Sequence, residues 1–273
     1  MRLDLHTHTT ASDGAFSPSQ LIEAAVAGRL DAVAITDHDS VEGVDEALQA
    51  AQDLPLEVIP GIEVSSTLDG REVHMLGYFV DLSNAPLRAH GHRASNRREE
   101  RLREMIQRLE EDEGLSIPFE TVLDAAGPEQ FTLGRPHLAR AMTTLGFVAS
   151  PDEAFLRYLS NDHPAYVPTD LVTPAEAVEL IQQAGGVSVW AHPGREDLSV
   201  LLSDLVDAGL QGLEVFRPRN SARWVLELEG LARHYGLVVS GGSDWHGPAG
   251  GSDLGDFHVG ADEVGRLLEL GGL

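Results

Sequence analysis

Short apolar segments alternate with helix-like segments over most of this 273-residue chain, and this alternation constrains the fold more than any other feature. Apolar or alternating runs of four to eight residues predict strands, and the segments after them that open with capping residues predict helices. Strand–helix alternation on this scale favours a parallel sheet or a closed barrel. The predicted strands are 2–5, 32–35, 57–62, 73–80, 187–190, 212–216 and 237–240.

The middle of the chain departs from this alternation. Residues 93–113 are rich in Arg and Glu, and apolar residues within them recur at the spacing of one amphipathic helix. Shorter helix-like segments, separated by Gly and Pro, follow up to residue 159. We therefore predict an α/β domain formed by residues 1–93 and 165–273. A helical insertion at residues 94–164 would interrupt this domain and cap a substrate site.

The net charge of the chain limits the classes of partner that it can bind. Arg and Lys together number 19 against 44 Asp and Glu, a formal charge of −25 at pH 7. This charge opposes long-range attraction to phosphate backbones and anionic membranes. We therefore expect no membrane association and no stable binding of duplex nucleic acid. The N-terminal segment lacks the apolar run of a signal peptide, so we expect a cytoplasmic protein.

Two missing residue types exclude several chemistries. Every basic residue is Arg, so neither a Schiff-base Lys nor the phosphate-binding Lys of a P-loop is present. The chain has no Cys, which excludes disulfides, thiolate metal sites and a Cys nucleophile. Pyridoxal-phosphate enzymes and P-loop kinases are therefore excluded.

Histidines and carboxylates gather at predicted strands, mostly just after them. His6 and His8 follow the first strand and, two residues apart in an extended chain, would point to the same side. The loops after parallel strands converge on one face, where active sites of α/β folds are built. The further residues placed in this way are Asp13, Asp37, His38, Asp39, Glu63, His74, His192, Asp244 and His246. The histidines interpreted instead as surface or hydrogen-bonded polar residues are His90, His92, His163, His234 and His258.

This arrangement predicts a site for more than one metal ion. Imidazole and carboxylate without thiolate suit Zn²⁺, Mn²⁺ or Fe²⁺ better than Ca²⁺ or Mg²⁺. The candidate ligands exceed one coordination shell, so we expect two or three divalent ions. Clustered ions stabilise charge on phosphoryl oxygens and lower the pKa of a shared water. The expected reaction is hydrolysis of a phosphoester by metal-bound hydroxide.

In their order and residue types, these segments resemble the PHP (polymerase and histidinol phosphatase) family. The resemblance rests on His6-Thr7-His8, Asp13-Gly14, Thr36-Asp37-His38-Asp39, Pro60-Gly61-Ile62-Glu63, His74, Ala191-His192-Pro193 and Gly242-Ser243-Asp244-Trp245-His246-Gly247. It implies a distorted seven-stranded (β/α) barrel with a trinuclear metal centre. The nine ligands that it implies are His6, His8, Asp13, His38, Glu63, His74, His192, Asp244 and His246.

The resemblance also suggests roles within this set. Glu63 would bridge two ions, and Asp13, His38 and His192 would act in catalysis as well as ligation. Asp37 and Asp39 would orient ligands. Asp39 has an alternative role as the cap of a helix that starts near Val41.

The insertion and the Gly134-Arg135-Pro136-His137 segment resemble small bacterial phosphoesterases that remove the 3′-phosphate of nucleoside 3′,5′-bisphosphates. Arg135 and His137 would then contact a substrate phosphate, and Arg195 is a further phosphate-binding candidate. Alternatively, Arg135 pairs with an acidic neighbour and Pro136 begins a helix. Arg217 stands where the resemblance leads us to expect a His-bearing or small-residue segment, so the leaving group is not assigned.

Other functions stay open at this point. A 5′–3′ exoribonuclease acting on short RNA ends and a histidinol phosphatase share the metal chemistry. Many amidohydrolases that begin with His-x-His bridge their metals with a carboxylated Lys, which this chain lacks. A non-catalytic metal site would normally be a closed single-ion shell. The expected partner is a small phosphorylated substrate, a nucleotide or short oligonucleotide, and the oligomeric state is not predicted.

Overall fold

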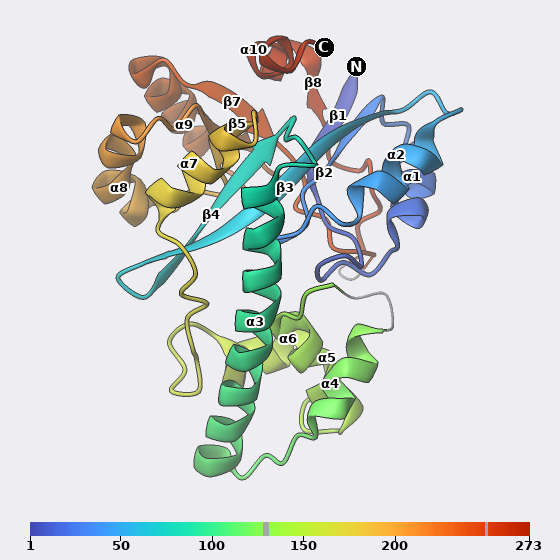
Figure 1. Cartoon of the computed structure of the whole chain (residues 1–273), viewed down its shortest axis with the longest axis vertical. Helices are drawn as coiled ribbons and strands as arrows, with labels where there is room; N and C mark the ends of the chain where they lie inside the picture. The colour runs from blue at the N-terminus through green and yellow to red at the C-terminus, as the bar shows by residue number, and fades with distance from the viewer. Residues whose placement is uncertain (128–130, 249–250) are drawn as a thin grey trace.

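The described strands form one eight-stranded sheet in the order β7-β6-β5-β4-β3-β2-β1-β8 (Figure 1). The structure, a computed structural model, describes residues 1–127, 131–248 and 251–273. The strands are β1 (Arg2–Thr7), β2 (Ala32–Ile35), β3 (Glu57–Leu68), β4 (Arg71–Tyr78), β5 (Val187–Trp190), β6 (Gly212–Phe216), β7 (Val238–Gly241) and β8 (Val259–Gly260).

The sheet is nearly closed into a barrel. Thr7 at the end of β1 bridges Trp245, just after β7, so the two sides of the sheet meet. Strands β1 to β3 are parallel, as are β5 to β7. The predicted α/β class and distorted barrel are confirmed. The sequence pattern did not reveal β8, a two-residue strand antiparallel to β1.

Strand β4 runs antiparallel to both of its neighbours, which departs from a purely parallel sheet. The reason is local. Asp69 and Gly70 form the two-residue connection between β3 and β4, and both have positive φ, 49° and 78°. An Asp-Gly pair in this conformation is a tight hairpin turn, which reverses the chain. His74 therefore reaches the site from a reversed strand.

Helices surround the sheet and extend below it in Figure 1. They are α1 (Pro18–Ala27), α2 (Val44–Ala51), α3 (Ala85–Glu113), α4 (Phe119–Ala126), α5 (Arg135–Thr144), α6 (Pro151–Ala154), the π-helical turn η1 (Phe155–Leu159), α7 (Pro174–Gln183), α8 (Arg195–Asp207), α9 (Ala222–Tyr235) and α10 (Ala261–Gly271). No helix in the described ranges is long and apolar enough to cross a membrane.

Helix α3 begins eight residues before the predicted start at residue 93. Asn84 caps it by accepting a hydrogen bond from the Leu87 backbone N–H at 3.0 Å, and a proline lies in the first turn. Its end at Glu113 agrees with the sequence, because Gly114 closes it in a left-handed conformation at φ 68°. The helix thus starts at the barrel and extends away from it (Figure 1).

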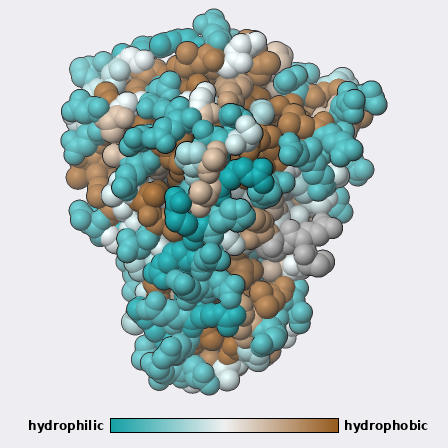
Figure 2. All heavy atoms as spheres, viewed as in Figure 1, coloured by the Kyte–Doolittle hydropathy of each residue, from teal (hydrophilic) through white to brown (hydrophobic). Residues whose placement is uncertain are grey.

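The two ends of α3 bury different kinds of side chain. The part of α3 up to Arg101 buries the polar side chains His90, Arg98 and Arg101 and the apolar Leu87, whereas the part after it buries Leu102 and Leu109. Figure 2 shows hydrophilic side chains along the outer face of this helix. The helix therefore meets the barrel through charged groups as well as Leu87, and the other cap helices through apolar groups.

A separate hydrophobic core lies below the barrel. It is built from buried residues between Leu102 and Val167, while two other apolar clusters belong to the strands and the helices around them. We call the part formed by α4, α5, α6, η1 and the distal half of α3 the cap. On this basis we propose that the cap is a folding unit of its own, close to the predicted boundaries at residues 94 and 164.

Substituting an apolar residue inside the cap core should destabilise the protein. Leu102 is 1% exposed, so Leu102→Ala should lower the free energy of unfolding by about 2–5 kcal/mol through lost burial and a cavity. Denaturant unfolding followed by circular dichroism measures this change. Leu156→Ala is the control, since Leu156 is 83% exposed and should cost less than about 0.5 kcal/mol. Equal losses in the two variants would contradict a packed cap core.

Candidate metal centre

Two histidine-containing segments lie side by side where the barrel closes. The Asp244 N–H donates to the His6 carbonyl, and the His8 N–H donates to the Trp245 carbonyl, both at 2.9 Å. This pairing brings the His6 and His8 Nε2 atoms within 3.4 and 3.3 Å of Asp244 Oδ1. His246 stacks on His8 with ring centroids 4.0 Å apart. The His-x-His and Asp-x-His segments thus form one cluster.

The carboxylate of Glu63, on β3, lies at the centre of this cluster. Its Oε2 atom lies 3.3 Å from His6 Nε2 and His8 Nε2, and 3.1 Å from His38 Nδ1. Its Oε1 atom lies 3.0 Å from both His74 Nδ1 and His192 Nε2. One carboxylate therefore contacts five imidazoles from four segments of the chain.

The remaining predicted ligand, Asp13, joins the cluster from the turn after β1. Its Oδ1 lies 3.3 Å from His246 Nε2, and its Oδ2 lies 4.0 Å from His38 Nε2. All nine residues predicted as ligands therefore lie in one contiguous group. Three subsets have ligand atoms close enough to share an ion: His8, Asp13, His38 and His246; His6, His8 and Asp244; and His38, Glu63 and His74.

The hydrogen bonding of these groups fits divalent cations. Several of their atoms are buried and have no hydrogen-bond partner among the described residues: His6 Nε2, His8 Nδ1 and Nε2, Asp13 Oδ1, His38 Nδ1 and Glu63 Oε2. Buried polar atoms normally find partners, so a convergent set without them needs an explanation. Imidazole nitrogens and carboxylate oxygens that face one another are the ligand types of Zn²⁺, Mn²⁺ and Fe²⁺.

Burial and neighbouring charges shift the pKa values of the clustered groups in different directions. Burial raises the pKa of Glu63, but the electrostatic effect of the surrounding histidines outweighs it and holds this pKa well below its ordinary value. Burial lowers the pKa of His38 to about 3, despite the nearby carboxylates. Glu63 is therefore ionised near pH 7. Against the effect of burial, the surrounding carboxylates raise the pKa of His6, His8 and His74, and that of His246 to about 10, so these imidazoles must release a proton when they bind a metal.

One further residue supports the cluster and was not selected from the sequence. Glu214 on β6 is fully buried, and its Oε1 lies 2.8 Å from His6 Nδ1. Its Oε2 accepts the His192 backbone N–H at 2.6 Å. It thus orients two predicted ligands at once. The available signal was a lone carboxylate inside the apolar run of residues 212–216.

The alternative role for Asp39, as a helix cap, is wrong. Helix α2 begins at Val44 with Gly43 before it, and no side chain caps it. The Asp39 carboxylate is instead buried and contacts His90 and Arg98, at 2.9 and 2.8 Å. His90 is therefore a hydrogen-bonded polar residue, as predicted. Asp37 holds the turn after His8 by accepting hydrogen bonds from Thr9 and Ser12.

The three residues predicted to bind substrate lie in different places. Arg135 pairs with Glu72 at 3.0 Å, and Pro136 lies in the first turn of α5, so both features of the alternative interpretation are present. Arg195 is 57% exposed, pairs with Glu227 at 2.6 Å and stacks on Trp224, outside the ligand cluster. His137 alone borders the cluster.

Helix α5 meets the cluster through His137 and Arg140. His137 is fully buried, and its Nδ1 accepts the Gly134 N–H at 2.9 Å, so its Nε2 carries the proton. That Nε2 has no partner among the described residues, and the same holds for the buried Arg140 Nε. Arg140 Nη2 lies 3.4 Å from the Asp13 carbonyl. One face of α5 thus presents two free donors beside Asp13.

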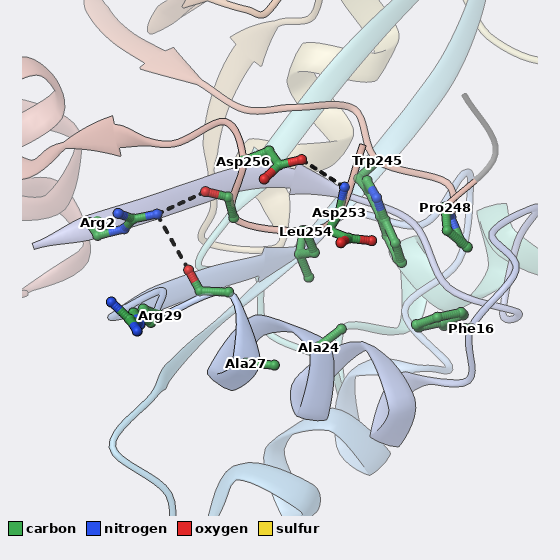
Figure 3. Close-up of a pocket in the computed structure, with 12 residues that line it drawn as sticks. Arg2, Phe16, Ala24, Ala27, Arg29, Trp245, Pro248, Asp253, Leu254 and Asp256 are labelled. Carbon is green, nitrogen blue, oxygen red and sulfur yellow. Dashed lines mark hydrogen bonds between the residues drawn. The ribbon is translucent and has the colours of Figure 1, made fainter. Parts of the chain in front are cut away.

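Two cavities lie on either side of Trp245. The larger, of about 750 Å³, is lined by the predicted ligands Asp244 and His246 together with Arg217, Arg219 and Phe257. The other, of about 470 Å³, lies between α1 and the segment before β8 (Figure 3). No predicted ligand lines it, and Arg2 at its rim donates to the carbonyls of Gly28 and Gly255. Only the larger cavity therefore adjoins the cluster.

Comparison with known proteins gives a consistent result. Residues 4–131 match the model of the PHP domain. The chain is 35% identical over 261 residues to the 5′-3′ exoribonuclease Rnm of Salmonella typhimurium, covering 92% of this chain and 87% of the relative. It is also 35% identical over 260 residues to the 3′,5′-nucleoside bisphosphate phosphatase of Chromobacterium violaceum, covering 93% and 90%.

A solved structure resembles the whole chain. It comes from Bifidobacterium adolescentis and is described as a candidate metal-dependent phosphoesterase. The two chains superpose with a TM-score of 0.88 at 32% identity, over 98% of this chain and 96% of the other. The likeness therefore includes the cap as well as the barrel.

Removing one shared ligand should abolish most metal-dependent hydrolysis. His8 belongs to two of the three candidate ion groups, so His8→Ala should lower kcat/KM for an aryl phosphate by at least about 100-fold. Bound metal, measured by elemental analysis, should fall with it. The exposed His234 provides the control variant His234→Ala, which should keep both values. Unchanged metal content and activity in His8→Ala would contradict the proposed centre.

Proposed function

This chain belongs to the PHP-domain family, and we propose that it removes the 3′-phosphate from nucleoside 3′,5′-bisphosphates. The family membership makes it a metal-dependent phosphoesterase, a hydrolase. The bisphosphate substrate is the finer step. It is supported by the Chromobacterium violaceum relative, which shares 35% identity over nearly the full length of both chains.

The observation that carries this proposal is the 750 Å³ cavity beside Asp244 and His246. Its size falls within the range of small-molecule sites. Two of the proposed metal ligands form part of its wall, so a phosphate at the metals would leave the rest of a nucleotide in this cavity. The walls also supply an aromatic ring, Phe257, and carboxylates that accept hydrogen bonds from a base or ribose.

We assign the predicted roles to the chain's own residues as follows. The nine clustered residues would hold two or three divalent ions, with Glu63 as a shared ligand, and Asp13, His38 and His192 would border the reacting phosphate. When bound, such ions stabilise charge on phosphoryl oxygens and activate water. The imidazole and carboxylate donors favour Mn²⁺, Zn²⁺ or Fe²⁺ and do not select one of them.

His137 and Arg140 orient the phosphate that is removed. Burial lowers the pKa of His137 to about 4, so the imidazole is neutral and its Nε2–H is a donor without an acceptor. A buried donor without a partner is costly, and a phosphate oxygen above Asp13 would satisfy it. Arg140 adds a guanidinium one helical turn further along the same face of α5.

The second phosphate needs a cation away from the metals. Arg219 is exposed, lines the large cavity and makes no ion pair within the described part of the chain. Arg135, the residue predicted from the sequence, already shares Glu72 with Arg101. Arg217 is also occupied, since it pairs with Asp244 at 2.7 Å. We therefore assign the second phosphate to Arg219.

Substituting Arg219 should impair only substrates with two phosphates. Losing a charge-assisted contact costs on the order of 2–3 kcal/mol, so Arg219→Ala should lower kcat/KM for a nucleoside 3′,5′-bisphosphate about 30- to 150-fold. An aryl phosphate should lose less than about twofold, since it never makes the contact. Arg135→Ala, assayed in parallel, tests the residue predicted from the sequence. If Arg135→Ala alone shows the selective loss, the assignment moves to Arg135.

A control variant separates this effect from the loss of a surface charge. Arg233 is exposed and lines a different cavity, on α9. Arg233→Ala removes the same charge from the chain and should leave both substrates unaffected. A selective loss in this variant as well would mean that overall charge, rather than a contact, sets the preference.

A second candidate function is trimming of RNA from its 5′ end, which the 35% identity to the Salmonella exoribonuclease favours. The net charge of −25 opposes binding of long RNA, so this activity would act on short ends. A phosphate-release and product screen decides between the two. We expect higher kcat/KM for 3′,5′-bisphosphates than for 5′-phosphorylated oligoribonucleotides, mononucleotides or histidinol phosphate. Faster release of mononucleotides from the oligoribonucleotide would instead establish the exoribonuclease.

A further inference from the structure

A buried ion pair joins the long helix of the cap to the turn that carries His38. The guanidinium of Arg98, on α3, donates from Nε and Nη2 to Asp39 Oδ2 at 2.9 and 2.8 Å. Its Nη2 also donates to Ser65 Oγ at 2.6 Å. The Asp39 side chain is fully buried, and that of Arg98 is 8% exposed. This two-bond geometry is specific to arginine.

Asp39 in turn is held from several sides. Its Oδ1 accepts the Ser65 backbone N–H at 2.8 Å and lies 2.9 Å from His90 Nε2. Its backbone is left-handed, with φ 53°, which is unfavourable for a residue with a side chain. Such conformations persist only where the surroundings impose them. Here the surroundings are two side chains of α3 and one strand residue.

The turn that contains Asp39 also forms two hydrogen bonds with the backbone of Glu63. The Asp39 N–H donates to the Glu63 carbonyl at 2.9 Å, and the Glu63 N–H donates to the Asp37 carbonyl at 3.0 Å. His38 lies between these two contacts. The conformation of Asp39 therefore sets how His38 and the Glu63 carboxylate face each other, 3.1 Å apart.

The backbone of helix α3 packs directly against the Asp39 turn. A Cβ atom added to Gly91 would lie 2.8 Å from the Asp39 carbonyl oxygen, which is closer than real Cβ contacts. Only glycine lets the helix backbone approach so closely. Gly91, His90 and Arg98 thus form one surface of α3 that fits the Asp39 turn.

We propose that Arg98 is a positioning residue that, through Asp39, sets the metal affinity of the ion groups containing His38. Two of the three candidate groups contain His38, while the group of His6, His8 and Asp244 does not. Arg98 should therefore act on some ions and spare others. This inference goes beyond the proposed function, because it concerns metal binding and holds for any substrate.

Electrostatics alone gives the opposite sign, which makes the proposal testable. Arg98 is a buried cation, and Asp13 and Glu72 are among the charges that act on it. Replacing it with a neutral residue removes repulsion toward a metal cation and leaves Asp39 without its counterion. Simple Coulomb attraction would then tighten metal binding. A positioning role predicts weaker binding, because the turn loses the contact that imposes its conformation.

The experiment titrates the metal-stripped full-length chain with Mn²⁺, following free Mn²⁺ by electron paramagnetic resonance. For Arg98→Met we expect a loss of at least about tenfold in affinity for some of the ions, the size typical of residues that orient ligands. At least one ion should bind within about threefold of its wild-type affinity. Arg98→Lys keeps the charge without the two-bond geometry and should weaken the same ions.

Two further variants separate positioning from general loosening of the cap. Arg101→Met removes an equally buried arginine of α3, whose partner Glu72 keeps its ion pair with Arg135. It should bind Mn²⁺ within about threefold of wild type. Gly91→Ala changes no charge but forces α3 away from Asp39, and it should weaken the same ions as Arg98→Met. Circular dichroism and melting temperature establish that each variant is folded.

The outcomes divide cleanly. Weaker binding in Arg98→Met and Gly91→Ala, with Arg101→Met unaffected, supports the proposal. Equal or tighter binding in Arg98→Met overturns it, as does an equal loss in Arg101→Met. If Arg98→Met does not fold, Gly91→Ala and Arg98→Lys give the decision. Because no nucleotide enters the titration, a wrong substrate assignment leaves this result intact, and a wild-type chain that binds no Mn²⁺ refutes the positioning role.

Discussion

The buried carboxylate of Glu63 is the constraint on which the rest of the site depends. An ionised carboxylate is stable in a protein interior only with close donors or cations, and Glu63 has five imidazoles within 3.0–3.3 Å. Those imidazoles lie on or just after strands β1, β2, β4 and β5, which flank β3 in the sheet, and the closure between Thr7 and Trp245 adds Asp244 and His246 to them. Convergence also needs unusual backbone conformations. Asp39, His192 and Asp244 all have positive φ, between 33° and 59°. Among the described residues, Arg29, Asp69, Phe79 and Asp170 share this conformation outside the cluster, so it is not confined to the site.

The clustering of the nine candidate ligands could be predicted from the sequence because most of them sit at the end of an apolar strand. That position places a polar side chain at the edge of the sheet, and several such positions imply one shared site. Glu214 orients two of these residues, but it lies inside an apolar run, where a single charged residue does not by itself indicate a site. Asp39 was ambiguous for another reason. A carboxylate before a helix resembles a cap, and only the tertiary contact with Arg98 shows its role. The reversal of β4 was readable from Asp69-Gly70, but strand–helix alternation elsewhere masked it.

The apolar periodicity of the sequence identifies only part of helix α3. Apolar spacing correctly marks its distal half, which packs into the cap core. The proximal half buries Arg98 and Arg101, and a buried arginine looks the same in a sequence as a solvated one. What distinguishes them is a carboxylate far along the chain: Asp39 for Arg98, and Glu72 for Arg101. Such partners become visible only when the fold brings β4 and the turn after β2 against the helix.

These ion pairs also explain how an acidic chain can receive an anionic substrate. Apolar packing does not fix the relative orientation of two segments, whereas an arginine–carboxylate contact with two hydrogen bonds does. Burial protects this contact from screening by salt. Barrel carboxylates neutralise the arginines that hold the cap, so those arginines do not draw the substrate phosphate away from the metal ligands. Two of the donors without hydrogen-bond partners, His137 Nε2 and Arg140 Nε, belong to α5, which meets the cluster beside Asp13. The cap therefore divides its basic groups by position: those at the barrel wall hold the cap in place, and those at the metal ligands stay free for a phosphate.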